Sequence, residues 1–241
     1  MYPMTSLPAA YRAVVPFKRL SLAKSRIALH APDRAVLALA MARDTLAAVM
    51  ASGGVASVTV VTDAAEYAET ARGFGAAVLP DPGDLNLGLR QAAVGADRVV
   101  VILADLPALT PAGIAALLDS AESHIVDRKP CFVADASGTG TTAYLAPRGS
   151  FAPSFGPGSA VRHREQGAVE LPGPRPGELG ESSRAWAGLR HDVDDLPSVV
   201  AARRLGVGVH TRATLAALRL DEALDRNSLG PGPSRPAEPP S

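Results

Sequence analysis

VVVILADLP, residues 99–107, is the stretch that decides the fold. Its first five residues are all apolar and predict a short strand buried on both faces, because a half-exposed strand would alternate apolar and polar side chains. The strand ends at Asp105 in a short loop that contains Pro107. A carboxylate at the end of a hydrophobic strand costs free energy unless a cation or hydrogen-bond donors meet it. Asp105 is therefore the first candidate metal ligand, and Mg²⁺ is the partner that we expect.

Further apolar runs of the same kind alternate with helical patterns along the chain. The expected strands lie at residues 13–17, 58–61, 76–79 and 131–134. The expected helices between them lie at residues 33–50, 64–72 and 111–120. Thr110 and Pro111 suit the start of the last helix, as its cap and its first residue. This alternation predicts an α/β fold with a mostly parallel sheet that helices cover.

The second half of the chain has a weaker pattern. Residues 146–188 contain six prolines and predict mainly loop, with one helix at residues 159–166. A strand at residues 189–193 is expected next, followed by helices near residues 197–205 and 211–220.

Length and composition indicate one domain. The chain has 241 residues, of which 47% are hydrophobic and 20% charged, and this is enough to bury a core. We expect an N-terminal tail at residues 1–11, the domain at residues 12–226, and a disordered tail rich in Gly, Pro and Ser at residues 227–241. Cys131 is the only cysteine, which excludes an intramolecular disulfide and fits a cytoplasmic location.

The charge balance argues against nucleic acid and membranes as partners. The chain has 24 basic residues (Lys and Arg) and 24 acidic residues (Asp and Glu), so no overall positive field attracts polyanions. No apolar run approaches the ~20 residues that span a bilayer.

A basic segment follows the first expected strand directly. Residues 18–26 read KRLSLAKSR and carry four cations. Ligands of open parallel sheets bind beyond the carboxyl ends of the strands, so Lys18, Lys24 and Arg26 are candidates for binding a triphosphate. The segment has no glycine and matches neither common phosphate-binding fingerprint, so it would use side-chain charge. A solvated basic loop is the alternative.

Two more carboxylates stand at Asp192 and Asp194. Side chains alternate along an extended segment, so both carboxylates are expected on the same side. With Asp105 they would supply the oxygen ligands that Mg²⁺ prefers. The alternative is that Asp194 and Asp195 cap a helix that starts near Pro197.

Two segments containing glycine and hydroxyl residues are candidate binding loops. In residues 138–142, GTGTT, glycine lets the backbone approach a ligand and Thr141 offers a hydroxyl, although a tight hairpin turn explains the same pattern.

Asn86 follows the third expected strand. Its side-chain amide would bind a base or a ribose there, or it would serve a turn.

Residues 155–159, FGPGS, form the second segment. Gly156 and Ser159 lie at the start of an expected helix whose amino end, with Arg162 and His163 nearby, would attract an anion. The alternatives are a capped surface helix and, for His163, a satisfied structural histidine.

These segments resemble one family when they are taken together and in order. They are Pro16-x-Lys18 with Ala23-Lys24-Ser25-Arg26, Leu85-Asn86, Asp105-Leu106-Pro107, Gly138-Thr139-Gly140-Thr141, Phe155-Gly156-x-x-Ser159-x-x-Arg162-His163, and Asp192-Val193-Asp194. They resemble the 2-phospho-L-lactate and phosphoenolpyruvate guanylyltransferases, which act in making the deazaflavin coenzyme F-420. The resemblance spans residues 12–210. It implies a GT-A-like, Rossmann-like nucleotidyltransferase fold: a three-layer sandwich with a mixed sheet.

The resemblance also implies roles for residues. Asp105, Asp192 and Asp194 match the metal-binding aspartates of the family. Thr141, Gly156 and Ser159 match positions that hold the phosphorylated acid, and Lys24 with Arg26 falls in the nucleotide-phosphate loop.

The activity implied is the condensation of GTP with phosphoenolpyruvate to enolpyruvyl-diphospho-5'-guanosine and pyrophosphate. The alanine-rich composition resembles that of actinobacteria, whose members are associated with phosphoenolpyruvate. Thr142 stands where the family often has asparagine, so 2-phospho-L-lactate and 3-phosphoglycerate are alternative acceptors. A homodimer and the next transferase of the pathway are the partners considered. The rival functions are a sugar-phosphate nucleotidyltransferase, a glycosyltransferase, and a non-catalytic nucleotide-binding protein.

Overall fold

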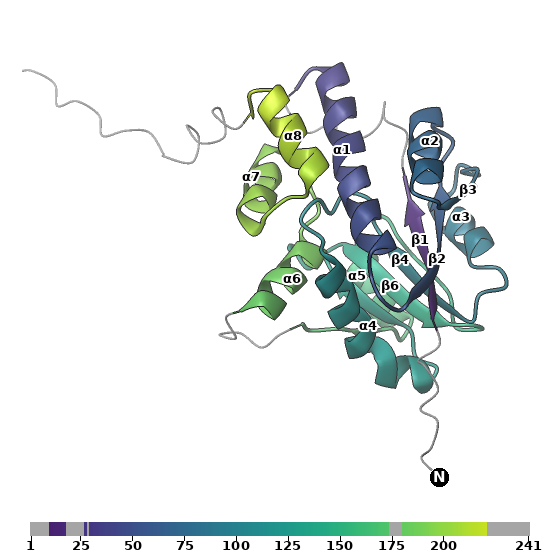
Figure 1. The fold of residues 1–241 in the computed structure, drawn as a ribbon. Helices are drawn as coiled ribbons and strands as arrows, with labels where there is room; N and C mark the ends of the chain where they lie inside the picture. Colours follow the sequence, from purple (N-terminus) through teal and green to yellow (C-terminus); the bar gives the residue numbers. More distant parts are fainter. Residues whose placement is uncertain (1–9, 18–26, 28, 174–179, 221–241) are drawn as a thin grey trace, which may run out of the picture.

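A mixed β-sheet forms the middle of the molecule (Figure 1). The structure is a computed structural model that describes residues 10–17, 27, 29–173 and 180–220. Within these residues, seven strands form one sheet in the order β3-β2-β1-β4-β6-β5-β7. The strands are β1 (Tyr11–Pro16), β2 (Val55–Val61), β3 (Ala77–Leu79), β4 (Arg98–Ile102), β5 (Cys131–Ala134), β6 (Thr141–Pro147) and β7 (Val169–Glu170).

Neighbouring strands are parallel except at β6, which pairs antiparallel with both β4 and β5. Near the centre, Val14 of β1 lies opposite Thr59 of β2 and Val101 of β4. Both faces of β4 are buried, as its unbroken apolar run predicts. The expected α/β fold with a mixed, mostly parallel sheet is confirmed.

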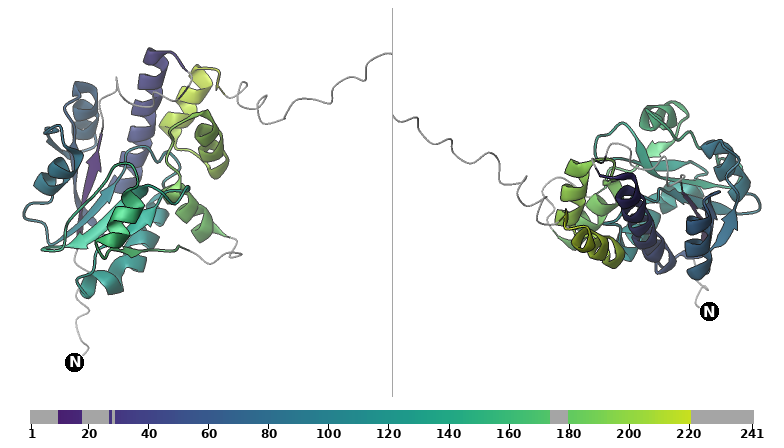
Figure 2. Two further views of the ribbon diagram at one scale, coloured as in Figure 1. Left: turned by 180° about the vertical axis from the view of Figure 1, so that it is seen from behind. Right: turned by 90° about the horizontal axis from the view of Figure 1, so that it is seen from above.

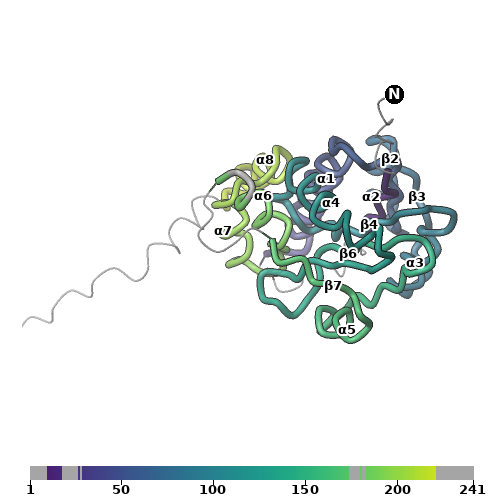
Figure 3. Tube along the Cα trace, turned by 90° about the horizontal axis from the view of Figure 1, so that it is seen from below, coloured from purple at the N-terminus to yellow at the C-terminus, as the bar shows by residue number. Residues whose placement is uncertain are grey.

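Helices cover both faces of the sheet. They are α1 (Ala31–Met50), α2 (Ala65–Gly73), α3 (Leu85–Ala92), α4 (Pro111–Val126), α5 (Ser159–Glu165), α6 (Glu181–Arg190), α7 (Leu196–Leu205) and α8 (Val209–Ala217). One core cluster joins a face of the sheet to α1, α2, α4 and α6, and a second joins the other face to α3 and α5. Figure 3 shows α5 on the opposite side of β6 and β7 from α1 and α4. This is the three-layer sandwich that the family resemblance implies.

The last two helices lie at one end of the molecule, where α8 packs on α1 (Figures 1 and 2). A smaller hydrophobic cluster joins Leu37 and Met41 of α1 to Val199 of α7 and Leu215 of α8. The helix α1 therefore has two buried faces: one covers the sheet and the other carries the C-terminal helices.

The prediction of a strand at residues 189–193 is wrong. Leu189 belongs to the last turns of α6, and residues 191–194 have no regular secondary structure. Ala185 and Trp186, four and three residues before Leu189, are buried with it. This spacing is helical, so the apolar residues here follow the helical period and not the strand period.

Other boundaries also differ from the predictions. The helix α4 continues to Val126, because Ala121 and Ile125 extend its buried face beyond residue 120. The elements α3, α6, β6 and β7 have no counterpart among the predicted strands and helices. The strand β1 begins at Tyr11, one residue before the expected start of the domain, whereas the expected C-terminal tail lies outside the described residues. In the part of the chain that the structure covers, no helix has the length and apolar character to cross a membrane.

Candidate active site

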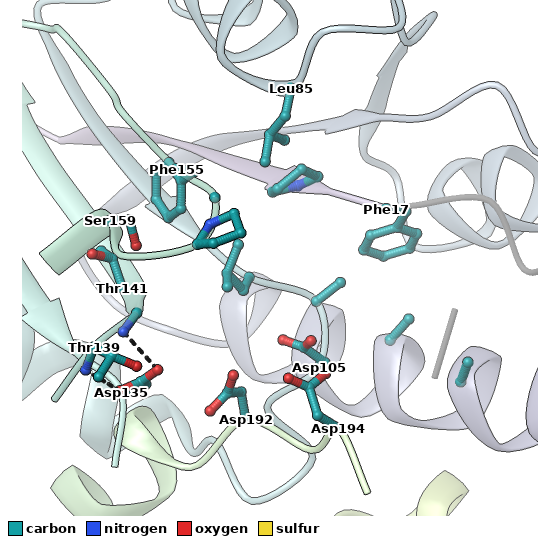
Figure 4. A pocket seen from close by; sticks show the side chains of 18 of the residues that line it. Phe17, Leu85, Asp105, Asp135, Thr139, Thr141, Phe155, Ser159, Asp192 and Asp194 are labelled. Carbon is teal, nitrogen blue, oxygen red and sulfur yellow. Dashed lines mark hydrogen bonds between the residues drawn. The ribbon is translucent and has the colours of Figure 1, made fainter. Parts of the chain in front are cut away.

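A cavity of about 540 Å³ opens beyond the carboxyl-terminal ends of β1, β4 and β5 (Figure 4). Open α/β sheets bind their ligands at this edge. Six of the predicted site residues line the cavity: Asp105, Asp192, Asp194, Thr141, Gly156 and Ser159. The predicted phosphate-binding residues Lys18, Lys24 and Arg26 lie outside the described residues.

The loop that carries Asp105 is fastened to the helix α1. Thr45 Oγ1 of α1 lies 3.1 Å from the carbonyl oxygen of Ala104 and accepts a hydrogen bond from the Leu106 amide at 3.2 Å. These two contacts hold the backbone on either side of Asp105. The Asp105 carbonyl in turn accepts a hydrogen bond from the Val193 amide at 3.1 Å, which fixes the segment that contains Asp192 and Asp194.

The segment of residues 191–195 is also fixed at both ends. At its start, Arg190 donates from Nε to the Ala134 carbonyl and from a terminal nitrogen to the Asp135 carbonyl, each at 3.0 Å. At its end, Asp195 caps α7 by accepting a hydrogen bond from the Ser198 amide at 2.9 Å. The helix-cap alternative is thus confirmed for Asp195, whereas Asp194 lines the cavity.

Figure 4 shows the carboxylates of Asp105, Asp192 and Asp194 directed toward a common space in the cavity. Within the described ranges, no group of three or more His, Cys, Asp or Glu side chains has the spacing of a complete metal site. The chemistry of the donor set nevertheless fits Mg²⁺, which binds carboxylate oxygens and completes its shell with water and substrate phosphates.

Asp135 is a cavity residue that the sequence analysis missed. Its Oδ1 accepts hydrogen bonds from the Thr139 amide at 3.0 Å and the Ser137 hydroxyl at 2.8 Å, and its Oδ2 accepts one from the Gly140 amide at 2.8 Å. These bonds build the turn between β5 and β6, so the hairpin alternative for GTGTT is confirmed. The sequence pattern that indicates such a turn is an aspartate directly after a strand, followed by Ser137 and Gly138.

Gly140 of this turn has no space for a side chain. A Cβ atom there would clash with Asp135 Oδ2. Glycine therefore lets the carboxylate reach the backbone of the turn that presents Thr141 to the cavity.

Asn86 and Arg162 shape the opposite loop rather than line the cavity. Asn86, in α3, accepts a hydrogen bond from the Phe155 amide at 2.8 Å and donates one to the Phe155 carbonyl at 3.1 Å. Arg162 donates to the carbonyls of Ser154, at 2.9 Å, and Pro157. Both side chains hold the loop that carries Gly156, and Asn86 does not serve a turn as the alternative reading expected.

His163 lies behind the cavity and is fully buried. Its Nδ1 is 2.9 Å from Thr141 Oγ1, and its Nε2 accepts a hydrogen bond from the Ser154 amide at 3.0 Å. Burial, with a smaller effect of Arg162, lowers the pKa of His163 to about 4, so the ring is neutral at pH 7. The satisfied-histidine alternative agrees with these contacts.

Two aromatic residues that the sequence analysis did not select form another wall. Phe17 and Tyr67 line the cavity with their ring centroids 4.8 Å apart in an edge-to-face arrangement. Burial, and then the nearby charge of Asp105, raise the pKa of Tyr67 well above its usual value. The Tyr67 hydroxyl therefore stays protonated beside the acidic side of the cavity.

Comparison with known proteins identifies the family. Residues 11–169 match a family described as "Guanylyl transferase CofC like". The chain belongs to this family. A phosphoenolpyruvate guanylyltransferase from Nocardia farcinica is 41% identical to the chain over 86% of its length and 92% of the relative. Another, from Mycobacterium sp. (strain KMS), is 43% identical over 88% of the chain and 94% of the relative.

Solved structures of more distant proteins share the fold of this guanylyltransferase. A putative nucleotide-diphospho-sugar transferase from Desulfovibrio desulfuricans superposes with a TM-score of 0.62 at 17% identity, over 90% of the chain and 98% of the other protein. A nucleotidyl transferase from Methanothermobacter gives a TM-score of 0.54 at 21% identity, over 81% of the chain and 96% of the other protein. These likenesses establish the nucleotidyltransferase fold.

The contact of Thr45 with the Asp105 loop gives a testable prediction. We expect Thr45→Val to lower kcat/KM of the guanylyltransferase by about 10-fold, because Asp105 is the predicted metal ligand and loss of a group that orients a metal ligand typically costs about 10- to 100-fold. The variant keeps the shape of the side chain but removes the hydroxyl that holds Ala104 and Leu106. Steady-state rates across a Mg²⁺ titration measure the effect.

Thr45→Ser, which keeps the hydroxyl, is the matched control and should retain most of the activity. Equal rates for Thr45→Val and the wild type, at all Mg²⁺ concentrations, would contradict a positioning role for Thr45.

Proposed function

We propose that this guanylyltransferase condenses GTP with phosphoenolpyruvate to enolpyruvyl-diphospho-5'-guanosine and pyrophosphate, a step in making coenzyme F-420. The names of the relatives from Nocardia and Mycobacterium support phosphoenolpyruvate as the acceptor. The observation that carries the proposal is one cavity in which Asp105, Asp192 and Asp194 lie together and Thr141 and Ser159 lie on another side (Figure 4). Gly156 lines the same cavity. This division suits a metal-bound triphosphate beside a phosphorylated acid.

The reaction is an in-line displacement at phosphorus. A phosphate oxygen of phosphoenolpyruvate attacks the α-phosphorus of GTP, the bond from that phosphorus to the β-phosphate bridging oxygen breaks, and pyrophosphate leaves. The attacking oxygen is already anionic near neutral pH, so no general base is required. This agrees with the environment of His163, whose two ring nitrogens are already engaged, one with the Thr141 hydroxyl and the other with the Ser154 amide.

The chemical requirement is to bring two anions together. Mg²⁺ held by Asp105, Asp192 and Asp194 would neutralise phosphate charge at the reacting centre. Lys18, Lys24 and Arg26 would bind the triphosphate, and the Thr141 and Ser159 hydroxyls would hold oxygens of the acceptor. Fixing both substrates in one cavity lowers the entropic part of the barrier.

We propose Mg²⁺ as the cofactor and the cytoplasm as the location. A homodimer and contact with the next transferase of the pathway stay predictions.

A substrate-matrix assay tests the proposed function. Pyrophosphate release is measured for GTP, ATP, CTP and UTP, each with phosphoenolpyruvate, 2-phospho-L-lactate and 3-phosphoglycerate, with Mg²⁺ present. We expect the highest kcat/KM for GTP with phosphoenolpyruvate, and no release after chelation of the metal.

The outcomes separate the rival functions. Preference for 2-phospho-L-lactate or 3-phosphoglycerate would replace the acceptor and keep guanylyl transfer. Absence of release with every pair would reject the proposal and favour a nucleotide-binding protein without catalytic activity.

A further inference from the structure

His163 stands one layer behind the acceptor side of the cavity. It is 0% exposed, and three aromatic rings surround it, with the Tyr144 ring stacked at 4.7 Å and those of Phe132 and Phe155 each at 5.5 Å. These rings fix the plane of the imidazole and therefore the directions in which its two nitrogens point. The cavity lining contains Thr141 but not His163.

The Ser154 contact determines which ring nitrogen carries the proton. A backbone N–H can only donate, so His163 Nε2, 3.0 Å from the Ser154 nitrogen, must be the acceptor and bear no hydrogen. The neutral ring then has its hydrogen on Nδ1, which points at Thr141 Oγ1 at 2.9 Å. Because the pKa of His163 is lowered to about 4, this neutral form is the relevant one near pH 7.

The tautomer of His163 in turn determines the direction of the Thr141 hydroxyl. A hydroxyl has one hydrogen to donate and two lone pairs, and one lone pair of Thr141 Oγ1 receives the Nδ1–H of His163. The hydroxyl hydrogen must therefore point elsewhere. Thr141 is the first residue of β6 and lines the cavity. A ligand bound in the cavity would therefore be the acceptor of that hydrogen.

We propose that His163 is a positioning residue that makes the Thr141 hydroxyl a hydrogen-bond donor toward the acceptor substrate. The Ser154 N–H donates to Nε2 of His163, and the Nδ1–H of His163 donates to Oγ1 of Thr141. The proposal rests on the proposed function, because it assigns Thr141 to the acceptor.

The chemical class recognised at this position follows from the direction of donation. The Thr141 hydroxyl offers a hydrogen, so it binds an anionic oxygen, a phosphate or a carboxylate, and such charge-assisted hydrogen bonds are the stronger ones. A neutral hydroxyl of another substrate could accept the same hydrogen, but it would lack the negative charge that strengthens the bond.

The test has two parts, and the first needs no substrate. ¹⁵N-edited NMR of the full chain reports the tautomer of His163, with His163→Gln used to assign its signals. We expect hydrogen on Nδ1 and none on Nε2 at pH 7. Hydrogen on Nε2, or a charged ring, would overturn the proposal whatever reaction the enzyme catalyses.

The second part is a double-mutant cycle with steady-state kinetics. His163→Gln should raise KM for phosphoenolpyruvate by roughly 10-fold or more, while KM for GTP changes by less than about 2-fold. In the Thr141→Val background, which lacks the hydroxyl, His163→Gln should change KM for phosphoenolpyruvate by less than about 2-fold. His163→Asn, which keeps an N–H donor near the Nδ1 position, should restore part of the affinity.

A purely structural role predicts different results. His163→Gln would then raise both KM values together, and its effect would persist in the Thr141→Val background; either result overturns the proposal. Failure of the proposed function is a separate outcome, since the wild type itself would release no pyrophosphate with phosphoenolpyruvate, and the NMR result would still decide the tautomer.

Discussion

Asp105→Asn is expected to lower kcat/KM for GTP by at least about 100-fold while the protein stays folded. Asparagine keeps the size of the side chain, but it removes the negative charge that a metal ion needs as a ligand. Charge stabilisation by a bound metal contributes several kcal/mol to a transition state, and each ~1.4 kcal/mol corresponds to tenfold in rate. The backbone contacts around Asp105 with Thr45 and Val193 do not depend on its carboxylate.

The measurement is the rate of pyrophosphate release over a range of Mg²⁺ concentrations, with thermal unfolding recorded in parallel. Asp119→Asn is the matched control, because Asp119 is exposed on α4, away from the cavity lining. The control should have wild-type kinetics, and both variants should melt within a few degrees of the wild type. Full Mg²⁺-dependent activity in Asp105→Asn would show that the metal assignment is wrong.

Asp135 differs from Asp105 in the hydrogen bonds that its carboxylate accepts from the chain. Asp105 and Asp135 both follow buried strands, β4 and β5, and both line the cavity. The oxygens of Asp135 accept three hydrogen bonds from the turn that leads to Thr141. Its charge is thus compensated by donors of the chain itself, and its role is to shape the loop.

Much of the site was predictable because it lies where strands end. The buried run of β4 placed Asp105 at the carboxyl edge of the sheet, and topology then brought it to the cavity. Asp192 and Asp194 were also predicted at the site, but through a strand that does not exist. Their spacing of two gave the same result in an irregular segment, which the backbone amide of Val193 and the side chain of Arg190 hold in place.

The missed residues act through contacts that are distant in sequence. Thr45 holds the Leu106 amide across 61 residues, and a threonine inside a helix gives no sign of that partner. Tyr67 is an ordinary core residue in sequence, and only the fold places it beside Asp105. Asn86 was predicted to bind substrate directly, yet its amide is matched to the backbone of Phe155, a partner that no local pattern specifies.

Asp44→Ala is expected to lower the free energy of unfolding by about 3 kcal/mol, because a buried carboxylate that caps a helix would be lost. Asp44 of α1 is only 6% exposed. Its oxygens accept hydrogen bonds from the amides of His210, at 3.0 Å, and Thr211, at 2.7 Å, in the first turn of α8. The negative charge also compensates the positive end of the helix dipole.

For a chain of this size, we expect the melting temperature to fall by about 6–12 °C in differential scanning calorimetry. Arg43→Ala is the control, since Arg43 is the exposed neighbour on the same helix, and it should change the melting temperature little. A wild-type melting temperature in Asp44→Ala would contradict the capping role.

The loss of the cap should also affect the active site. The Gly208 amide, just before α8, donates a hydrogen bond of 2.9 Å to the carbonyl of Pro107, two residues after Asp105. Activity of Asp44→Ala should therefore decline at a lower temperature than its global unfolding, whereas coincident declines would show that α8 and the Asp105 loop are not coupled.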